Sequence, residues 1–302
     1  MKTSLDHLPQ AKRQQLAAIK KIIVGTIYPE KIILFGMHAT SAGEQGFFED
    51  GSLPFCLLNY DLLVITQRGD RRYDYEVQDI VENRCHSSIA VNVMVHDIDY
   101  VNGQLAAGHY FFSMIRRDAI LLHDAQGVPL VDSRDPDFQA IRLTAEHDFK
   151  HWWLRAGAFF RSARFNCQHK EWKIAVFLLH QAAEQAYQAI LLAFMGYKPC
   201  THNLDKLRRY TNRFSIELSM LFPRTTPEED RIFRLLLQGY VDARYKEDYR
   251  ISEQEVSQLA ERIERLLSIA ERVCRNRFIS LGKMAEAEKG KLILIYNDKK
   301  FL

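Results

Sequence analysis

The sequence lacks the features that mark secreted and membrane proteins. No stretch approaches the ~20 uncharged apolar residues that cross a bilayer, which argues against a membrane protein. Residues 1–21 contain no continuous apolar segment and no A-x-A-like cleavage site, so we expect no signal peptide. The five cysteines are scattered and form no C-x-x-C motif, which argues against a zinc ribbon or a disulfide framework. We therefore expect a cytoplasmic protein with reduced thiols and no membrane partner.

The glycine-rich signatures of the common nucleotide-binding folds are also absent, because the sequence contains neither a P-loop nor a Rossmann glycine motif. It does contain enough apolar residues for folded domains: of 302 residues, 47% are hydrophobic and 26% are charged. Residues 1–135 hold 13 Lys/Arg against 17 Asp/Glu, whereas residues 136–302 hold 28 against 21. This change of sign indicates two modules with different partners.

Apolar periodicity predicts a first module in which helices and strands alternate. The predicted helices span residues 10–28, 73–85 and 101–116, and the predicted strands span residues 31–36, 55–66, 88–96 and 119–123. Such an alternation favours a small mixed sheet covered by helices. Residues 124–137, which contain four aspartates, two prolines and a glycine, are typical of a linker.

Beyond the linker the periodicity is helical. Helices are predicted over residues 138–164, 171–195, 204–214, 227–241 and 252–279. Ser252 and Glu255 form a capping-box pattern before the last of them. We expect an up-and-down helical bundle, followed by an added edge strand over residues 291–296. The predicted fold class is therefore α+β, with domains at 1–130 and 131–282 and a C-terminal tail at 283–302.

Polar residues interrupt the apolar strands of the first module. Asn59 and Asp61 are two residues apart in one strand, so their side chains point to the same face. Gly36 and Met37 end the preceding strand, where glycine allows the backbone to approach a ligand. Asn92 is a lone polar residue in the next strand. These positions are candidates for a nucleotide site; the alternative is that Asn59 and Asp61 only cap a strand end or bond to a loop.

This arrangement resembles the nucleotidyltransferase superfamily of the minimal and kanamycin-nucleotidyltransferase type, over residues 10–125. The family carries Gly-Ser, then Asp-x-Asp, then a third Asp, and the resemblance implies that these acids hold divalent metals bridging nucleotide phosphates. This chain has Gly36-Met37, Asn59-Tyr60-Asp61 and Asn92 instead. Asp61 alone keeps a carboxylate, so it is the catalytic and metal-binding candidate.

Magnesium favours anionic oxygen ligands, and asparagine offers only a neutral carbonyl. We therefore expect a degenerate transferase site that does not transfer nucleotidyl groups. Mg²⁺ is the expected cofactor only if transferase activity survives, and no other cofactor is predicted.

Three motifs of the second module occur in order along the chain. They are H-Q-A-A-E ending at Glu184, T-H-N-L around His202, and A-R-Y at Arg244 and Tyr245, with Tyr249 shortly after. This order resembles the HEPN domain family, named for higher eukaryotes and prokaryotes nucleotide-binding, over residues 138–280. The resemblance implies nucleotide or RNA binding in a groove between helices. It also implies a homodimer, because HEPN-like bundles commonly pair.

Many members of that family cleave RNA through an arginine that is followed, four to six residues later, by a histidine. In this chain the arginine at that place is Arg244, and no histidine follows it because His202 is the last one. Tyr249 has the right spacing, but a phenol with a pKa of ~10 is a poor base at neutral pH. We therefore expect binding without cleavage by the family mechanism.

Candidate nucleotide-binding residues lie in both modules: Gly36, Met37, Asn59, Asp61, Glu184, His202, Arg244, Tyr245 and Tyr249. Arg244 suits a phosphate, and the two tyrosines suit base stacking. The alternative is structural: Arg244 pairs with Asp242, Asp248 or Glu184. For Glu184 and His202 we favour structural hydrogen bonding over catalysis.

The leading hypothesis is a cytoplasmic protein that binds ATP, GTP or RNA without the chemistry of either family. One alternative is an active nucleotidyltransferase that transfers a nucleoside monophosphate to a small molecule or a protein, with Asp61 holding a metal and Glu184 acting as base. The other alternative is a non-catalytic dimeric interaction module of toxin–antitoxin ancestry.

Overall fold

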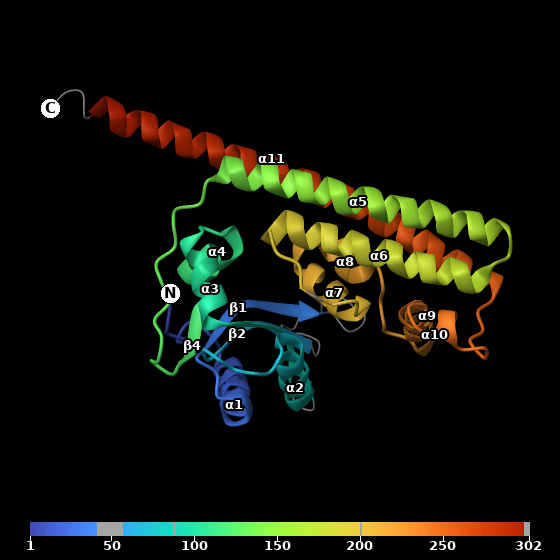
Figure 1. Cartoon of the computed structure of the whole chain (residues 1–302), viewed down its shortest axis with the longest axis horizontal. Helices are drawn as coiled ribbons and strands as arrows, with labels where there is room; N and C mark the ends of the chain where they lie inside the picture. The colour runs from blue at the N-terminus through green and yellow to red at the C-terminus, as the bar shows by residue number, and fades with distance from the viewer. Residues whose placement is uncertain (41–56, 87–88, 200, 299–302) are drawn as a thin grey trace, which may run out of the picture. The chain divides into compact units, whose positions relative to one another are not determined.

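The computed structural model describes residues 1–40, 57–86, 89–199 and 201–298. The chain divides into two compact units, Met1–Pro136 and Asp137–Leu302, whose elements are labelled in Figure 1. No helix in the described ranges is both long and apolar enough to cross a membrane.

The first unit is a four-stranded mixed sheet with helices. Its elements are α1 (Gln10–Ile27), β1 (Lys31–Thr40), β2 (Leu57–Thr66), α2 (Asp74–His86), β3 (Ala90–Asp97), α3 (Ile98–Ala106), α4 (Tyr110–Asp118) and β4 (Ile120–Asp124). The strand order is β3-β2-β1-β4, in which β1 runs antiparallel to β2 and β4 while β2 and β3 are parallel.

Alternating residues of the strands build the core of this unit. Leu62 and Val64 of β2 and Val93 of β3 are buried in one cluster with Ile19 of α1 and Val81 of α2. Because successive strand residues point to opposite faces, the residues between them face away from this cluster. Asp61 and Asn92 are therefore on the opposite face of the sheet from α1 and α2.

One predicted helix of this unit is wrong. Residues 101–116 were expected to form a single helix, but α3 ends at Ala106 and α4 begins at Tyr110. Gly108 between them has φ of 74°, a left-handed conformation that a helix interior does not adopt and that glycine accepts at little cost.

The second unit is helical, and the predicted α+β fold class is confirmed. Its elements are α5 (Phe138–Gln168), α6 (Trp172–Met195), α7 (Leu204–Thr211), η1 (Asn212–Phe214), α8 (Ile216–Met220), α9 (Pro227–Gln238), α10 (Asp242–Tyr245) and α11 (Glu253–Asp298). The long helices α5, α6 and α11 pack along one another (Figure 1). α6 is buried on nearly every side, because alanines such as Ala182, Ala183 and Ala186 let its neighbours approach closely.

The C-terminal edge strand predicted over residues 291–296 is wrong, because α11 continues through them to Asp298. The predicted capping box starts this helix: the Ser252 backbone N–H donates to Glu255 Oε2 at 2.6 Å, and the Glu255 N–H donates to Ser252 Oγ at 3.3 Å. No proline follows Pro227 in the sequence. α11 therefore contains no proline that would interrupt its extension once the first turn has formed.

Candidate nucleotide-binding site

A group of polar side chains is buried within α6. His180 is 1% exposed and Glu184 is 3% exposed, and their spacing of four residues places them on the same face of the helix. His180 Nδ1 lies 4.0 Å from Glu184 Oε2. A buried carboxylate needs hydrogen-bond partners, and the partners of Glu184 define the site.

His202 connects this buried carboxylate to the surface. The side chain of His202 is 66% exposed, and its Nδ1 lies 3.0 Å from Glu184 Oε1. Gln188 Nε2 donates to the same oxygen at 3.3 Å, and Gln181 Nε2 donates to the other oxygen at 3.4 Å. A carboxylate can only accept, so a neutral His202 carries its proton on Nδ1 and keeps the lone pair on Nε2.

Tyr240, which follows α9, brings these residues together with Arg244. The Tyr240 ring stacks on the His180 ring with centroids 5.1 Å apart and on the His202 ring with centroids 5.5 Å apart. The Arg244 guanidinium lies 4.7 Å from the centroid of the same ring. Residues from α6, from the segment before α7 and from α10 therefore meet at one aromatic side chain.

Arg244 is held among aromatic rings rather than by a carboxylate. Its guanidinium lies 5.0 Å from the Phe177 ring centroid and 4.8 Å from that of Tyr245, and its Nε donates to the Tyr240 carbonyl at 2.5 Å. Asp242, a candidate partner, pairs instead with Lys246 at 3.1 Å. Within the described residues Arg244 makes no ion pair, so its charge is available to an anionic ligand.

The two tyrosines predicted to stack on a base have different surroundings. Tyr245 is 73% exposed, which suits a stacking role. Tyr249 is buried, and its hydroxyl donates to the Leu235 carbonyl at 3.0 Å; burial also raises the pKa of this phenol. Tyr249 therefore packs inside the domain and is left out of the proposed site.

His180 is uncharged at neutral pH. Burial, with smaller effects from His202 and Arg244, lowers the pKa of His180 to about 4. Arg244 is the permanent cation of the site, and His180 contributes a neutral ring that stacks on Tyr240.

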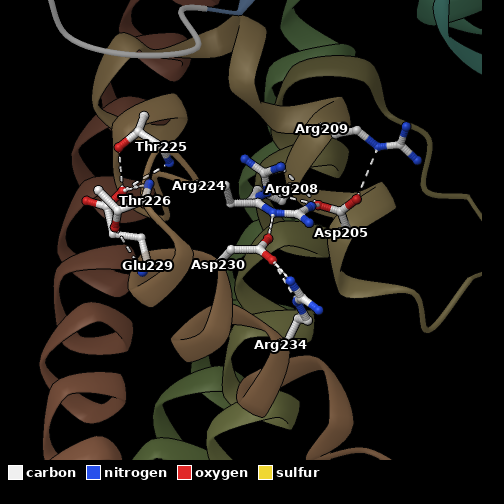
Figure 2. Close-up of polar contacts among 9 residues, drawn as sticks. All are labelled: Asp205, Arg208, Arg209, Arg224, Thr225, Thr226, Glu229, Asp230 and Arg234. Carbon is white, nitrogen blue, oxygen red and sulfur yellow. Dashed lines mark hydrogen bonds and ion pairs between the residues drawn. The ribbon is translucent and has the colours of Figure 1, made fainter.

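Four arginines near α7 and α9 contrast with Arg244, because carboxylates hold them: Arg208, Arg209, Arg224 and Arg234 (Figure 2). Asp205 pairs with Arg208 at 2.9 Å and with Arg209 and Arg224 at 3.6 Å, and Asp230 pairs with Arg224 and Arg234. Burial alone raises the pKa of the Asp205 carboxyl, but Arg208, Arg209 and Arg224 outweigh it and hold that pKa below its usual value. This network ties α7 to α9.

The strand register of the first unit places its predicted site residues at neighbouring positions of the sheet. Asp61 lies opposite Gly36 on β1 and opposite Asn92 on β3. Met37, which follows Gly36 on β1, is half-buried. Asp61 is 1% exposed, and Asn92 Nδ2 donates to its Oδ1 at 2.9 Å. Asn59 lies opposite His38 and Ala90 in the register; its side chain is outside the described set. Among the residues described, no group of three or more His, Cys, Asp or Glu side chains could hold a metal.

The second unit is thus a helical domain in which the buried Glu184 contacts the exposed His202, beside the surface residue Arg244. A family model of the HEPN domain matches residues 149–273, a range that contains Glu184, His202 and Arg244. The chain therefore carries a HEPN domain, as its motifs predicted. No curated protein matches the chain.

Sequence reasoning missed the residues that join the site. His180 begins the H-Q-A-A-E motif but had no assigned role, and neither had Tyr240 nor Phe177. A usable signal was present, because His180 precedes Glu184 by four residues and Tyr240 precedes Arg244 by four, the spacing of neighbours on a helix face.

Proposed function

We propose that the HEPN domain binds RNA, with Arg244 contacting a phosphate and Tyr245 stacking on a base. The observation that carries this proposal is the guanidinium of Arg244, which the aromatic rings of Phe177, Tyr240 and Tyr245 hold at the surface without a carboxylate partner in the described part of the chain. A guanidinium is a permanent cation with paired donors that match a phosphate, and an exposed phenol gives a base a stacking surface.

Fluorescence anisotropy with a labelled single-stranded RNA tests this proposal. Arg244→Ala is expected to weaken binding about tenfold or more, because it removes a charge-assisted contact, and Tyr245→Ala to weaken it about tenfold. Arg161→Ala is the matched control, because Arg161 is also exposed but lies on α5; it is expected to change binding less than twofold.

Competition with ATP and GTP shows whether the domain binds RNA or a free nucleotide. If either nucleotide binds and RNA does not, the ligand is a free nucleotide. If neither binds, the proposal is wrong. A dimer in light scattering together with no binding of RNA or nucleotide would favour the interaction-module alternative; the homodimer itself stays a prediction.

We propose further that the first unit is a degenerate nucleotidyltransferase-like domain that does not transfer nucleotidyl groups. The hydrogen bond from Asn92 to Asp61 supports this proposal. Asn92 stands where the nucleotidyltransferase pattern has an aspartate, and its amide donates to the Asp61 carboxylate instead of adding a second negative charge. An amide adds none of the charge that two metal ions and a triphosphate need.

Incubation with α-labelled ATP and Mg²⁺, in the presence of a metabolite or lysate pool, checks this second proposal. No label is expected on any acceptor, with the natural chain or with Asp61→Ala. Label transfer that Asp61→Ala abolishes would instead show an active transferase.

A further inference from the structure

A cavity of about 400 Å³ lies beside α4 in the first unit. This volume is within the ~300–1,000 Å³ of small-molecule sites. One wall of the cavity is α4, and another is the segment 132–136 that precedes α5. Asp61 and Asn92, the candidate transferase residues, do not line it. The cavity is therefore separate from that candidate site, and its chemistry depends on the side chains of these two walls.

Helical spacing decides which side chains of α4 face the cavity. Tyr110, Met114 and Arg117 line it and follow one another at intervals of four and three residues, so they share one face of the helix. Phe112 and Ile115, which are three residues apart, are buried in the unit on another face. α4 therefore presents an aromatic ring, a thioether and a guanidinium to the cavity.

Ser113, on the same wall, is a buried polar residue. It is 5% exposed, and its hydroxyl has no hydrogen-bond partner among the residues that the structure describes. A buried hydroxyl without a partner is costly, so this wall favours a polar ligand over an apolar one.

The charged side chains that line the cavity give it a formal charge of +1, from three arginines and two aspartates: Arg116, Arg117, Arg134, Asp132 and Asp135. The arginines differ in their partners. Arg117 donates to Asp118 at 3.0 and 2.8 Å, and Arg116 lies 3.2 Å from Asp132, whose side chain is 97% exposed. An ion pair with so exposed a carboxylate is weak, so Arg116 exchanges it for a ligand at little cost. Across the described ranges Arg134 forms no ion pair, and its charge is available to an anion.

The stem of Arg134 packs against the turn between α3 and α4. A Cβ added at Gly108 in this turn would lie 3.4 Å from Arg134 Cβ and 3.9 Å from its Cδ. Because the stem is already in contact, the guanidinium loses less side-chain freedom on binding a ligand than a fully solvated arginine does. Arg134 is therefore the side chain of this cavity best prepared to hold an anion.

We propose that this cavity binds a phosphate monoester of a small molecule, with the phosphate held by Arg134 and Arg116. A guanidinium is a permanent cation with paired donors that match phosphate oxygens. The two arginines come from different walls, so they offer donors to a tetrahedral group from two directions, whereas one guanidinium fork is enough for a planar carboxylate. Tyr110 and Met114 provide apolar surface for the organic part of the ligand.

Hydrogen exchange measured by mass spectrometry on the full chain, with and without phenyl phosphate, tests this proposal and localises the ligand. Phenyl phosphate is the probe because it joins a phosphate monoester to a small ring. At ten times its dissociation constant it is expected to slow exchange of α4 and of residues 131–135 by about tenfold. Arg134→Ala is expected to raise that dissociation constant by about tenfold or more. Arg71→Ala is the control, because Arg71 is also exposed but lies between β2 and α2; it is expected to leave the protection unchanged.

Benzoate, which has the same ring with a carboxylate, is expected to protect neither segment at the concentration at which phenyl phosphate saturates. Equal protection by benzoate would overturn the proposal, because the cavity would then not select a phosphate. Absence of protection by phenyl phosphate, or protection that persists undiminished in Arg134→Ala, would overturn it as well. The cavity shares no residue with the RNA site proposed for the second unit. Arg244→Ala is therefore expected to leave the protection of α4 unchanged, and each proposal can fail without the other.

Discussion

Replacing Lys31 by methionine is expected to lower the free energy of unfolding of the first unit by roughly 3 kcal/mol. Lys31 begins β1, a central strand, and is 2% exposed. Its Nζ lies 2.6 Å from Asp124 Oδ1 and 3.5 Å from Glu30 Oε1. Methionine fills the space but leaves the Glu30 carboxylate, 5% exposed, buried without its cation. An uncompensated buried charge costs far more than the pair contributes.

Hydrogen exchange measured by mass spectrometry on the full chain checks this result, because it reports each unit separately. Amides of β1 and β4 are expected to exchange on the order of 100-fold faster in Lys31→Met, and those of α5 and α6 to be unchanged. Lys21→Met, at an exposed position of α1, is the control.

Adding Glu30→Gln is expected to restore part of the loss in Lys31→Met. Glutamine keeps an oxygen that can accept from the Val128 N–H, now bonded to Glu30 Oε1 at 2.7 Å, and it carries no charge. Equal exchange in Lys31→Met and in the natural chain would show that this ion pair contributes no more than an apolar side chain does.

The regular elements could be predicted from the sequence because each has a local cause. The strands of the first unit are short apolar runs bounded by turn residues, and α6 and α11 have helical periodicity with clear starts. Where the local signal is ambiguous, the prediction was wrong. Residues 291–296 are a short apolar run that suits a strand or a helix, and α11 includes them because a helix already started extends at little cost.

The site was only partly predictable, because its members are joined by packing. The motifs identified Glu184, His202 and Arg244, but not that one ring, Tyr240, contacts both His202 and Arg244. The sequence also does not show that Tyr245 and Tyr249 differ in burial. Tyr245 is 73% exposed, whereas Tyr249 is 6% exposed. Burial of a loop side chain depends on long-range contacts. Here the Tyr249 hydroxyl donates a hydrogen bond to the Leu235 carbonyl of α9.

Gly239→Ala is expected to destabilise the second unit by about 1–3 kcal/mol and to weaken RNA binding at the same time. A Cβ at Gly239 would lie 2.6 Å from Val176 Cγ1, 3.0 Å from the Leu236 carbonyl and 3.2 Å from the Val176 carbonyl. The closest atom and one of the two backbone carbonyls belong to Val176 of α6, so the end of α9 must move away from α6. Tyr240 is the next residue, and its shift would separate His202 from Arg244.

Urea denaturation and RNA anisotropy, measured on the same variants, separate this steric effect from a conformational one. The φ of Gly239 is −54°, which alanine adopts without strain, so the Val176 contact is the expected cause. Gly157→Ala, where the nearest atom is the flexible end of Arg161 at 3.4 Å, is expected to be neutral or stabilising by ~0.5–1 kcal/mol. Because Val176→Ala removes the closest atom, Gly239→Ala should cost less in that background than alone. An equal cost in both backgrounds would show that this contact does not hold the end of α9 in place.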